Sequence, residues 1–69
     1  MDVRDNIRNY IRDKGFTQSI MAERAGMTPV KLSATLLKKR KLEVGEFIGL
    51  CEALGVSMEE MRDYGRKGI

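Results

Sequence analysis

Residues 17–41 read TQSIMAERAGMTPVKLSATLLKKRK, and this stretch decides how the rest of the chain is interpreted. Thr17 is a typical N-cap residue, and Gly26 is typical of the position just beyond a helix end. Between them, three apolar residues form an inner helical face: Ile20, Met21 and Ala25. Thr28 offers a second N-cap, and Pro29 occupies the first helical position, where no amide donor is lost. The stretch predicts two short helices joined by a tight turn.

Four consecutive basic residues, Lys38 to Lys41, directly follow the second of these helices. Two short helices joined in this way form a helix-turn-helix, whose second helix enters the major groove of DNA while flanking groups hold phosphates. A basic run in an arbitrary domain is usually a solvated loop, but its place directly after such a helix pair favours contacts with phosphates. The pattern therefore predicts a module that binds double-stranded DNA.

Size and composition indicate one small domain with an apolar core. The chain has 69 residues, of which 42% are hydrophobic. Cys51 is the single cysteine, and its apolar neighbours at helical spacing mark it as a core residue. An unpaired cysteine and the absence of a signal-peptide pattern predict a reducing cytosol. The apolar runs are far shorter than the ~18 residues that a membrane span needs.

The net charge of +3 is unevenly distributed along the chain. Residues 29–42 contain five basic side chains and no acid, whereas residues 43–64 contain six acids against Arg62 alone. This polarity predicts that the domain orients on a polyanion with its middle segment facing inward.

The remaining helices follow from apolar spacing and from capping residues. Helices are predicted over residues 2–14 and 43–54, each followed directly by a glycine. The segment Ser57-Met58-Glu59-Glu60 is a capping box that begins a last short helix. No alternating strand pattern occurs. The predicted fold is all-α, with five helices in a domain over residues 1–64 and a short basic tail over residues 65–69.

These residues resemble the DNA-binding domain of the lambda-repressor and Cro-like family, in particular the short regulators of Gram-positive phages and prophages. The resemblance covers roughly residues 3–62. The matching segments are Gly15 to Gln18, Ala22, Ala25 to Thr28, Leu32-Ser33, Lys39 to Leu42, Phe47 and Cys51 to Ser57. The resemblance implies a five-helix lambda-repressor-like domain with the helix-turn-helix at helices two and three. The chain departs from the family at Leu37-Lys38, where Asn-Gly often follows helix three, and at Thr35, where a larger apolar residue is common.

The resemblance also implies which residues face DNA. Gln18 matches the glutamine that begins helix two and binds a backbone phosphate. The loop that tracks the phosphates is matched by Lys38, Lys39, Arg40 and Lys41. The positions that face base edges are Thr28, Pro29, Val30, Lys31 and Ala34. Ser33 lies at the edge of this surface on a helical wheel, and its hydroxyl is a further candidate for a base contact.

The expected recognition surface contains no Arg, Asn or Gln, the residues that make bidentate contacts to guanine or adenine. Direct readout is then limited to lysines, to hydroxyls and to packing of Val30 and Ala34 against thymine methyl groups. Together with Leu37, the same two residues also form an apolar surface that can bind another protein. A protein-interaction module that keeps the fold is therefore the alternative to a sequence-specific DNA-binding transcriptional regulator, for which the resemblance implies a phage or mobile-element repressor.

No enzymatic activity, metal or cofactor is predicted. The chain has no histidine for acid–base work and no cysteine pair for a metal site. Gly45 and Gly49 on an acidic helix make no phosphate-binding loop. The pattern implies no small-molecule ligand and no membrane association.

A two-fold homodimer on DNA is expected, because one recognition helix covers only about four or five base pairs. Interface candidates lie in the C-terminal part, where Met58, Met61 and Tyr64 exceed what one short helix needs for docking. The alternative is that all three complete the core of the monomer. With DNA as the partner, the expected location is the bacterial cytosol, on the nucleoid.

Overall fold

The computed structural model describes residues 2–65 and contains five α-helices and no strand in that part of the chain. The helices are α1 (Val3–Lys14), α2 (Gln18–Arg24), α3 (Pro29–Leu36), α4 (Val44–Leu54) and α5 (Met58–Arg62). The all-α prediction and its five helices are confirmed. Most of the predicted basic tail, residues 66–69, lies outside the described residues.

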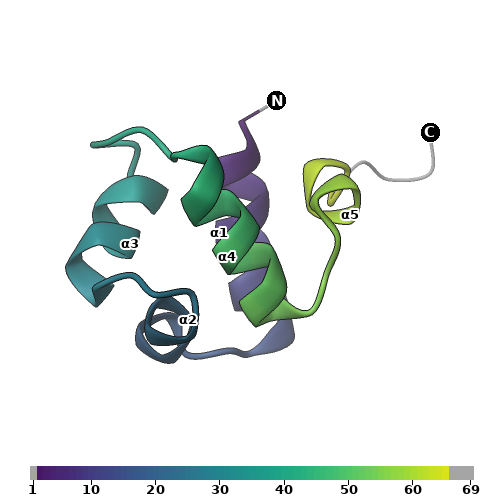
Figure 1. The fold of residues 1–69 in the computed structure, drawn as a ribbon. Coiled ribbons are helices and arrows are strands. Elements are labelled where there is room, and N and C mark those ends of the chain that lie inside the picture. The colour runs from purple at the N-terminus through teal and green to yellow at the C-terminus, as the bar shows by residue number, and fades with distance from the viewer. Residues whose placement is uncertain (1, 66–69) are drawn as a thin grey trace.

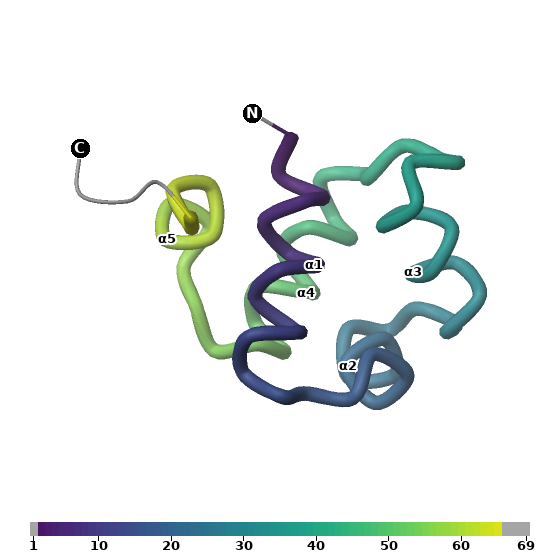
Figure 2. The backbone as a smooth tube through the Cα atoms, turned by 180° about the vertical axis from the view of Figure 1, so that it is seen from behind, coloured from purple at the N-terminus to yellow at the C-terminus, as the bar shows by residue number. Residues whose placement is uncertain are grey.

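Helices α1 and α4 form the middle of the domain, with α2 and α3 on one side and α5 on the other (Figures 1 and 2). The helix-turn-helix of α2 and α3 is closed by the turn that Gly26 makes in the left-handed region, with φ of 77°. After the turn, the amide of Met27 donates to the carbonyl of Ala22 over 2.9 Å. This leaves one side of α3 at the edge of the molecule, away from α1 and α4 (Figure 1).

Helix starts follow the capping residues read from the sequence, with one exception. The hydroxyl of Thr28 accepts the Lys31 amide over 3.1 Å and so caps α3. Ser57 and Glu60 form the predicted reciprocal capping box, each accepting a backbone amide of the other over 2.9 Å. Thr17 has the extended backbone of an N-cap, but its hydroxyl makes no capping hydrogen bond. The expectation that its side chain caps α2 is therefore wrong.

One apolar core receives side chains from all five helices. Its members are Ile7, Ile11, Met21, Ala22, Met27, Leu32, Leu36, Leu50, Cys51, Leu54 and Met61. Cys51 is buried as predicted, and burial raises the pKa of its thiol. Ile20 does not belong to the predicted inner face of α2, because it is 46% exposed. The core side of that helix is formed by Met21 and Ala22.

Gly49 lets α4 approach the end of α2 closely. A Cβ atom at this position would lie 2.9 Å from the carbonyl oxygen of Ala25, which is backbone and cannot swing aside. Gly45, one turn earlier on the same helix, faces open space. The two glycines therefore have different roles, although the sequence shows the same residue at both positions.

We expect Gly49→Ala to destabilise the domain by about 1–3 kcal/mol, because the added methyl group forces the backbone at the helix-turn-helix to shift. Gly45→Ala, the matched control, should stabilise it by about 0.4–1 kcal/mol by restricting the unfolded chain. Denaturant unfolding measures both changes. Equal stability of the two variants would contradict the close approach.

Candidate nucleic-acid interface

The exposed side of α3 and the start of α2 form a shallow hollow on the surface. The residues that line this α2–α3 hollow are Gln18, Ser19, Pro29, Val30, Ser33, Ala34, Leu37 and Lys39. Six of them were singled out from the sequence as base or phosphate contacts, and Leu37 as part of an apolar surface. Val30 is 79% exposed at the rim, and Leu37 is 55% exposed. The structure thus gathers most of the candidates on one surface, whose lining is half apolar and half polar.

Thr28 and Lys31 complete the set of base-facing candidates, and both are exposed beside this hollow. The Thr28 hydroxyl already accepts the capping bond from the Lys31 amide. It can still donate its proton and accept one further hydrogen bond, because a hydroxyl carries one proton and two lone pairs. Lys31 takes part in no ion pair among the described residues.

Helix α3 stops sharply although no glycine follows it. Lys38 adopts the left-handed conformation, with φ of 64°, at the position where a glycine is usual. The Lys39 amide donates to the Ala34 carbonyl over 2.8 Å, and the Lys38 amide donates to the Thr35 carbonyl over 3.0 Å. These two bonds define a Schellman motif. The departure at Leu37-Lys38 therefore changes which residue makes the turn and leaves the turn in place.

The four basic residues after α3 alternate between paired and unpaired charges. Lys38 pairs with Asp5 of α1 over 2.8 Å, and Arg40 pairs with Glu46 of α4 over 3.0 Å. Lys39 and Lys41 are exposed, and neither makes an ion pair within the described part of the chain. The sequence predicts phosphate contacts from all four residues. In the structure, only Lys39 and Lys41 have charges that are not paired with a carboxylate in the described part of the chain.

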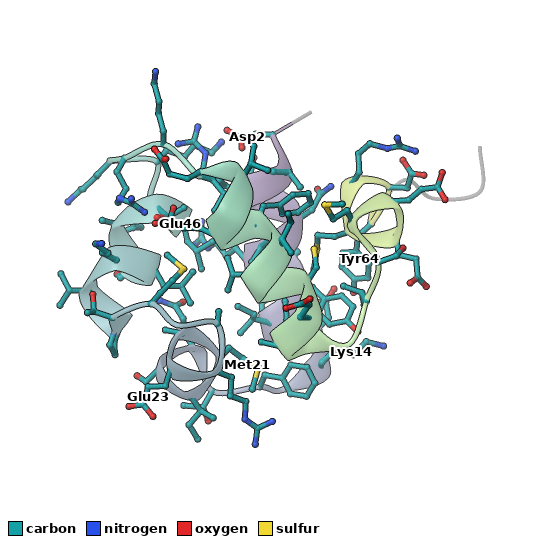
Figure 3. All side chains as sticks on the ribbon, viewed as in Figure 1. Asp2, Lys14, Met21, Glu23, Glu46 and Tyr64 are labelled. Carbon is teal, nitrogen blue, oxygen red and sulfur yellow. The ribbon has the colours of Figure 1, made fainter. Side chains whose placement is uncertain are left out.

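Arg40 and Glu46 form a half-buried ion pair where α4 begins. The two terminal guanidinium nitrogens of Arg40 donate to the carboxylate over 3.0 Å, and the Glu43 amide donates to it over 3.1 Å. The hydrogen bonds from Arg40 are the main cause that lowers the pKa of Glu46, followed by the bond from the Glu43 amide. The same pairing raises the pKa of Arg40. Figure 3 shows Glu46 on the side of α4 that faces α3.

A second ion pair lies at the N-terminus of α1. Arg4 donates to the Asp2 carboxylate over 2.7 Å and to the Arg40 carbonyl over 2.9 Å. The side-chain bond from Arg4 keeps the pKa of Asp2 far below its ordinary value. The loop after α3 is therefore held from α1 as well as from α4.

The three candidates for a dimer interface are placed differently by the structure. Met61 is only 1% exposed and belongs to the core of the monomer, so it is no longer an interface candidate. The Tyr64 hydroxyl donates to Asp13 over 2.8 Å, and its ring packs edge-on against Tyr10 at 5.0 Å between centroids. Tyr64 thus lies on the α1 side of α5 (Figure 3). Only Met58 remains largely exposed.

Met58 borders a surface that the sequence did not reveal. Two neighbouring hollows share Val3 and Phe47, and together they form a groove between α1, α4 and α5. Leu42 and Val44 line one of the two hollows, and Met58 lines the other, which lies beside α5. The groove joins residues distant in sequence, which helical spacing within one element does not reveal.

Thr35, Glu46 and Arg4 were not identified as site residues from the sequence. The relevant signal for Glu46 was an acid three residues after Glu43 at a predicted helix start, which is the spacing of a capping carboxylate. Arg4 carried no such signal, because its partner Arg40 lies 36 positions away.

In residues 2–65, no group of three or more His, Cys, Asp or Glu side chains is arranged to hold a metal ion. No helix in the same range combines the length and apolar character needed to cross a membrane.

Comparison with protein families gives one match. The model of the Cro/C1-type HTH DNA-binding domain matches residues 6–64, which is most of the chain. The comparison with curated proteins and the comparison with solved structures gave no match.

Proposed function

The chain belongs to the Cro/C1-type helix-turn-helix family of DNA-binding domains, and from this we propose that it represses phage or mobile-element genes by binding duplex DNA through α3. The observation that supports this best is the α2–α3 hollow. It gathers residues of both helices on one exposed surface and borders the unpaired charge of Lys39. Such a regulator acts in the cytosol on the nucleoid and needs no catalytic group.

In this proposal, base recognition relies on small contacts. Val30 and Ala34 pack against thymine methyl groups, while Lys31 donates to guanine. The hydroxyls of Thr28 and Ser33 supply further polar contacts. Because none of these is a bidentate contact, we infer that the sequence-dependent shape of DNA contributes to specificity.

Affinity comes mainly from the phosphates. Gln18 and Lys39 line the α2–α3 hollow, and Lys41 is exposed on the loop after α3, where it lines the hollow between α1 and α4. In this proposal these three residues supply the phosphate contacts. Lys38 and Arg40 are paired with carboxylates, so their net contribution to a phosphate contact is smaller.

The alternative, a protein-interaction module, is favoured by the exposure of Val30 and Leu37. The neighbouring positive charge favours DNA instead, because an apolar protein partner gains little from it. Salt separates the two cases: DNA binding weakens steeply as salt rises, whereas apolar docking hardly changes.

We expect Lys39→Ala and Lys41→Ala each to weaken binding to all duplexes alike and to reduce the slope of log K against log salt by about 0.9, because each removes one phosphate contact. Lys38→Ala, which removes a charge already paired with Asp5, is the matched control and should reduce the slope less. A titration at several salt concentrations measures the slopes. Equal slopes for the wild type and a Lys39→Ala/Lys41→Ala double variant would show that these lysines are merely solvated.

Ala34→Glu should abolish binding to a site selected from random duplexes, because it places a carboxylate against the base edges in the major groove of the DNA. The residue is on the outer side of α3, so we expect the melting temperature to change little. Gel-shift and thermal melting assays check the two parts separately. Retained binding would mean that α3 does not enter the major groove.

We further propose that two copies bind DNA as a two-fold dimer. A recognition surface without bidentate contacts needs a second half-site, and a two-fold pair reads half-sites about 34 Å apart. The groove between α1, α4 and α5 supplies an apolar surface for this pairing. Val44, which lines one of its two hollows, is 75% exposed, and Met58, which lines the other, is 47% exposed.

Val44→Glu and Met58→Glu should each remove cooperative binding to a palindromic operator, because they place a charge in the apolar contact. Both residues are exposed, so the variants should still fold, and binding to one isolated half-site is the control. Footprinting over a range of protein concentrations measures the cooperativity. One protein per duplex at full affinity on a non-repeated site would contradict the dimer.

A further inference from the structure

We propose that Arg40 is a positioning residue: its guanidinium group braces α3 against α4 and thereby sets the recognition helix, Lys39 and Lys41 in their DNA-binding geometry. The inference rests on the proposed function and goes beyond it in one respect. The sequence predicts phosphate contacts along the whole basic loop, whereas the structure assigns Arg40 an intramolecular role.

The guanidinium group lies between two helices. On one side it donates to the hydroxyl of Thr35 in α3 over 2.8 Å. On the other side it donates twice to the Glu46 carboxylate in α4, over 3.0 Å each. Among the side-chain hydrogen bonds of residues 2–65, this chain of three groups is the only link between α3 and α4. Without it, the orientation of α3 depends on apolar packing, on the turn after α2 and on the Lys38–Asp5 pair with α1.

Thr35 connects the brace to the recognition surface. Its side chain is fully buried, and its hydroxyl donates to the Lys31 carbonyl over 2.8 Å while accepting from Arg40. A hydroxyl can serve both bonds, since it carries one proton and two lone pairs. An apolar side chain at this position would lack that capacity. The Thr35 hydroxyl thus allows this position of α3 to accept the hydrogen bond from Arg40.

The backbone of Arg40 is held as firmly as its side chain. Its carbonyl accepts a 2.9 Å bond from Arg4, whose guanidinium group is itself fixed by Asp2. One residue thus joins α1, α3 and α4. Because Arg40 is held inward at both its carbonyl and its side chain, its neighbours Lys39 and Lys41 remain on the outside of the loop.

A direct phosphate contact by Arg40 would break this arrangement. The side chain would leave three hydrogen bonds, and the Glu46 carboxylate would remain half-buried with only the Glu43 amide as a donor. Charge-assisted, bidentate pairs of this kind are stronger than ordinary hydrogen bonds. The brace and a phosphate contact that turns the side chain outward therefore exclude each other, which makes them separable by experiment.

Glu46→Gln tests the brace against general electrostatics. Removing an acid from a protein that binds a polyanion ordinarily strengthens binding, but loss of the brace should weaken operator binding about two- to thirtyfold. Glu60→Gln is the matched control, since Glu60 closes the capping box of α5 in the same way and touches no part of the brace. We expect its affinity to equal or exceed that of the wild type.

Arg40→Lys and Arg40→Met separate positioning from charge. Lysine keeps the charge but lacks the planar fork, so the brace predicts that both variants weaken binding and keep the wild-type salt slope. A phosphate contact predicts the opposite: full affinity for Arg40→Lys and a slope lower by about 0.9 for Arg40→Met. Thr35→Val and Thr35→Ser provide a second test that leaves every charge in place. Only the serine variant should retain binding.

Thermal melting confirms that each variant is folded at the temperature of the titration. If an Arg40 variant is unfolded there, the comparison of Thr35→Val with Thr35→Ser tests the brace instead. The proposal is overturned if Glu46→Gln binds as tightly as Glu60→Gln, if Arg40→Lys keeps full affinity, or if Thr35→Val binds like Thr35→Ser. If the wild-type protein shows no salt-dependent binding to any duplex, that result would instead contradict the proposed DNA-binding function.

Discussion

Helix α3 is attached to the domain by one side only, and the surface offered to a partner depends on that attachment. Leu32 and Leu36 enter the apolar core, with Thr35 fully buried between them. Eight residues are too few for a helix to be stable alone in water, so these inward side chains maintain its structure as well as its position. The outward side chains of α3 therefore need no role in folding and remain available for recognition.

The position of α3 also depends on the close packing of α4 against the end of α2. Gly49 brings α4 against the Ala25 carbonyl at the end of α2, and Gly26 turns the chain toward α3 directly afterwards. A domain of this size buries only about 60% of the surface that its unfolded chain exposes, so it has little surplus stability with which to absorb a poor fit. The helix-turn-helix angle thus depends on small residues at a few points of contact.

The fold could be predicted from local signals because each of them acts within one helix. The capping groups of Thr28 and Ser57 and the glycines that end α1 and α4 need only their own neighbours, and the structure has them as expected. The tertiary pairing of the charges could not be predicted in this way. A run of four basic residues gives no indication that Arg40 turns toward Glu46, because that choice depends on where α4 begins in space. The same holds for Met61, which the sequence leaves open between a dimer interface and the core of the monomer, since its burial depends on how α5 docks.

A recognition surface of small side chains increases the importance of position. A long side chain such as arginine can follow a displaced base, whereas the methyl groups of Val30 and Ala34 contact thymine only if the helix lies at the right depth and angle. The pairing of Arg40 with Thr35 and Glu46 diverts a cation from phosphate contact and adds a directional constraint where apolar packing has none. For a protein of this kind, holding α3 firmly contributes more to discrimination between sequences than one further charge on the loop, because a charge strengthens binding to every duplex equally.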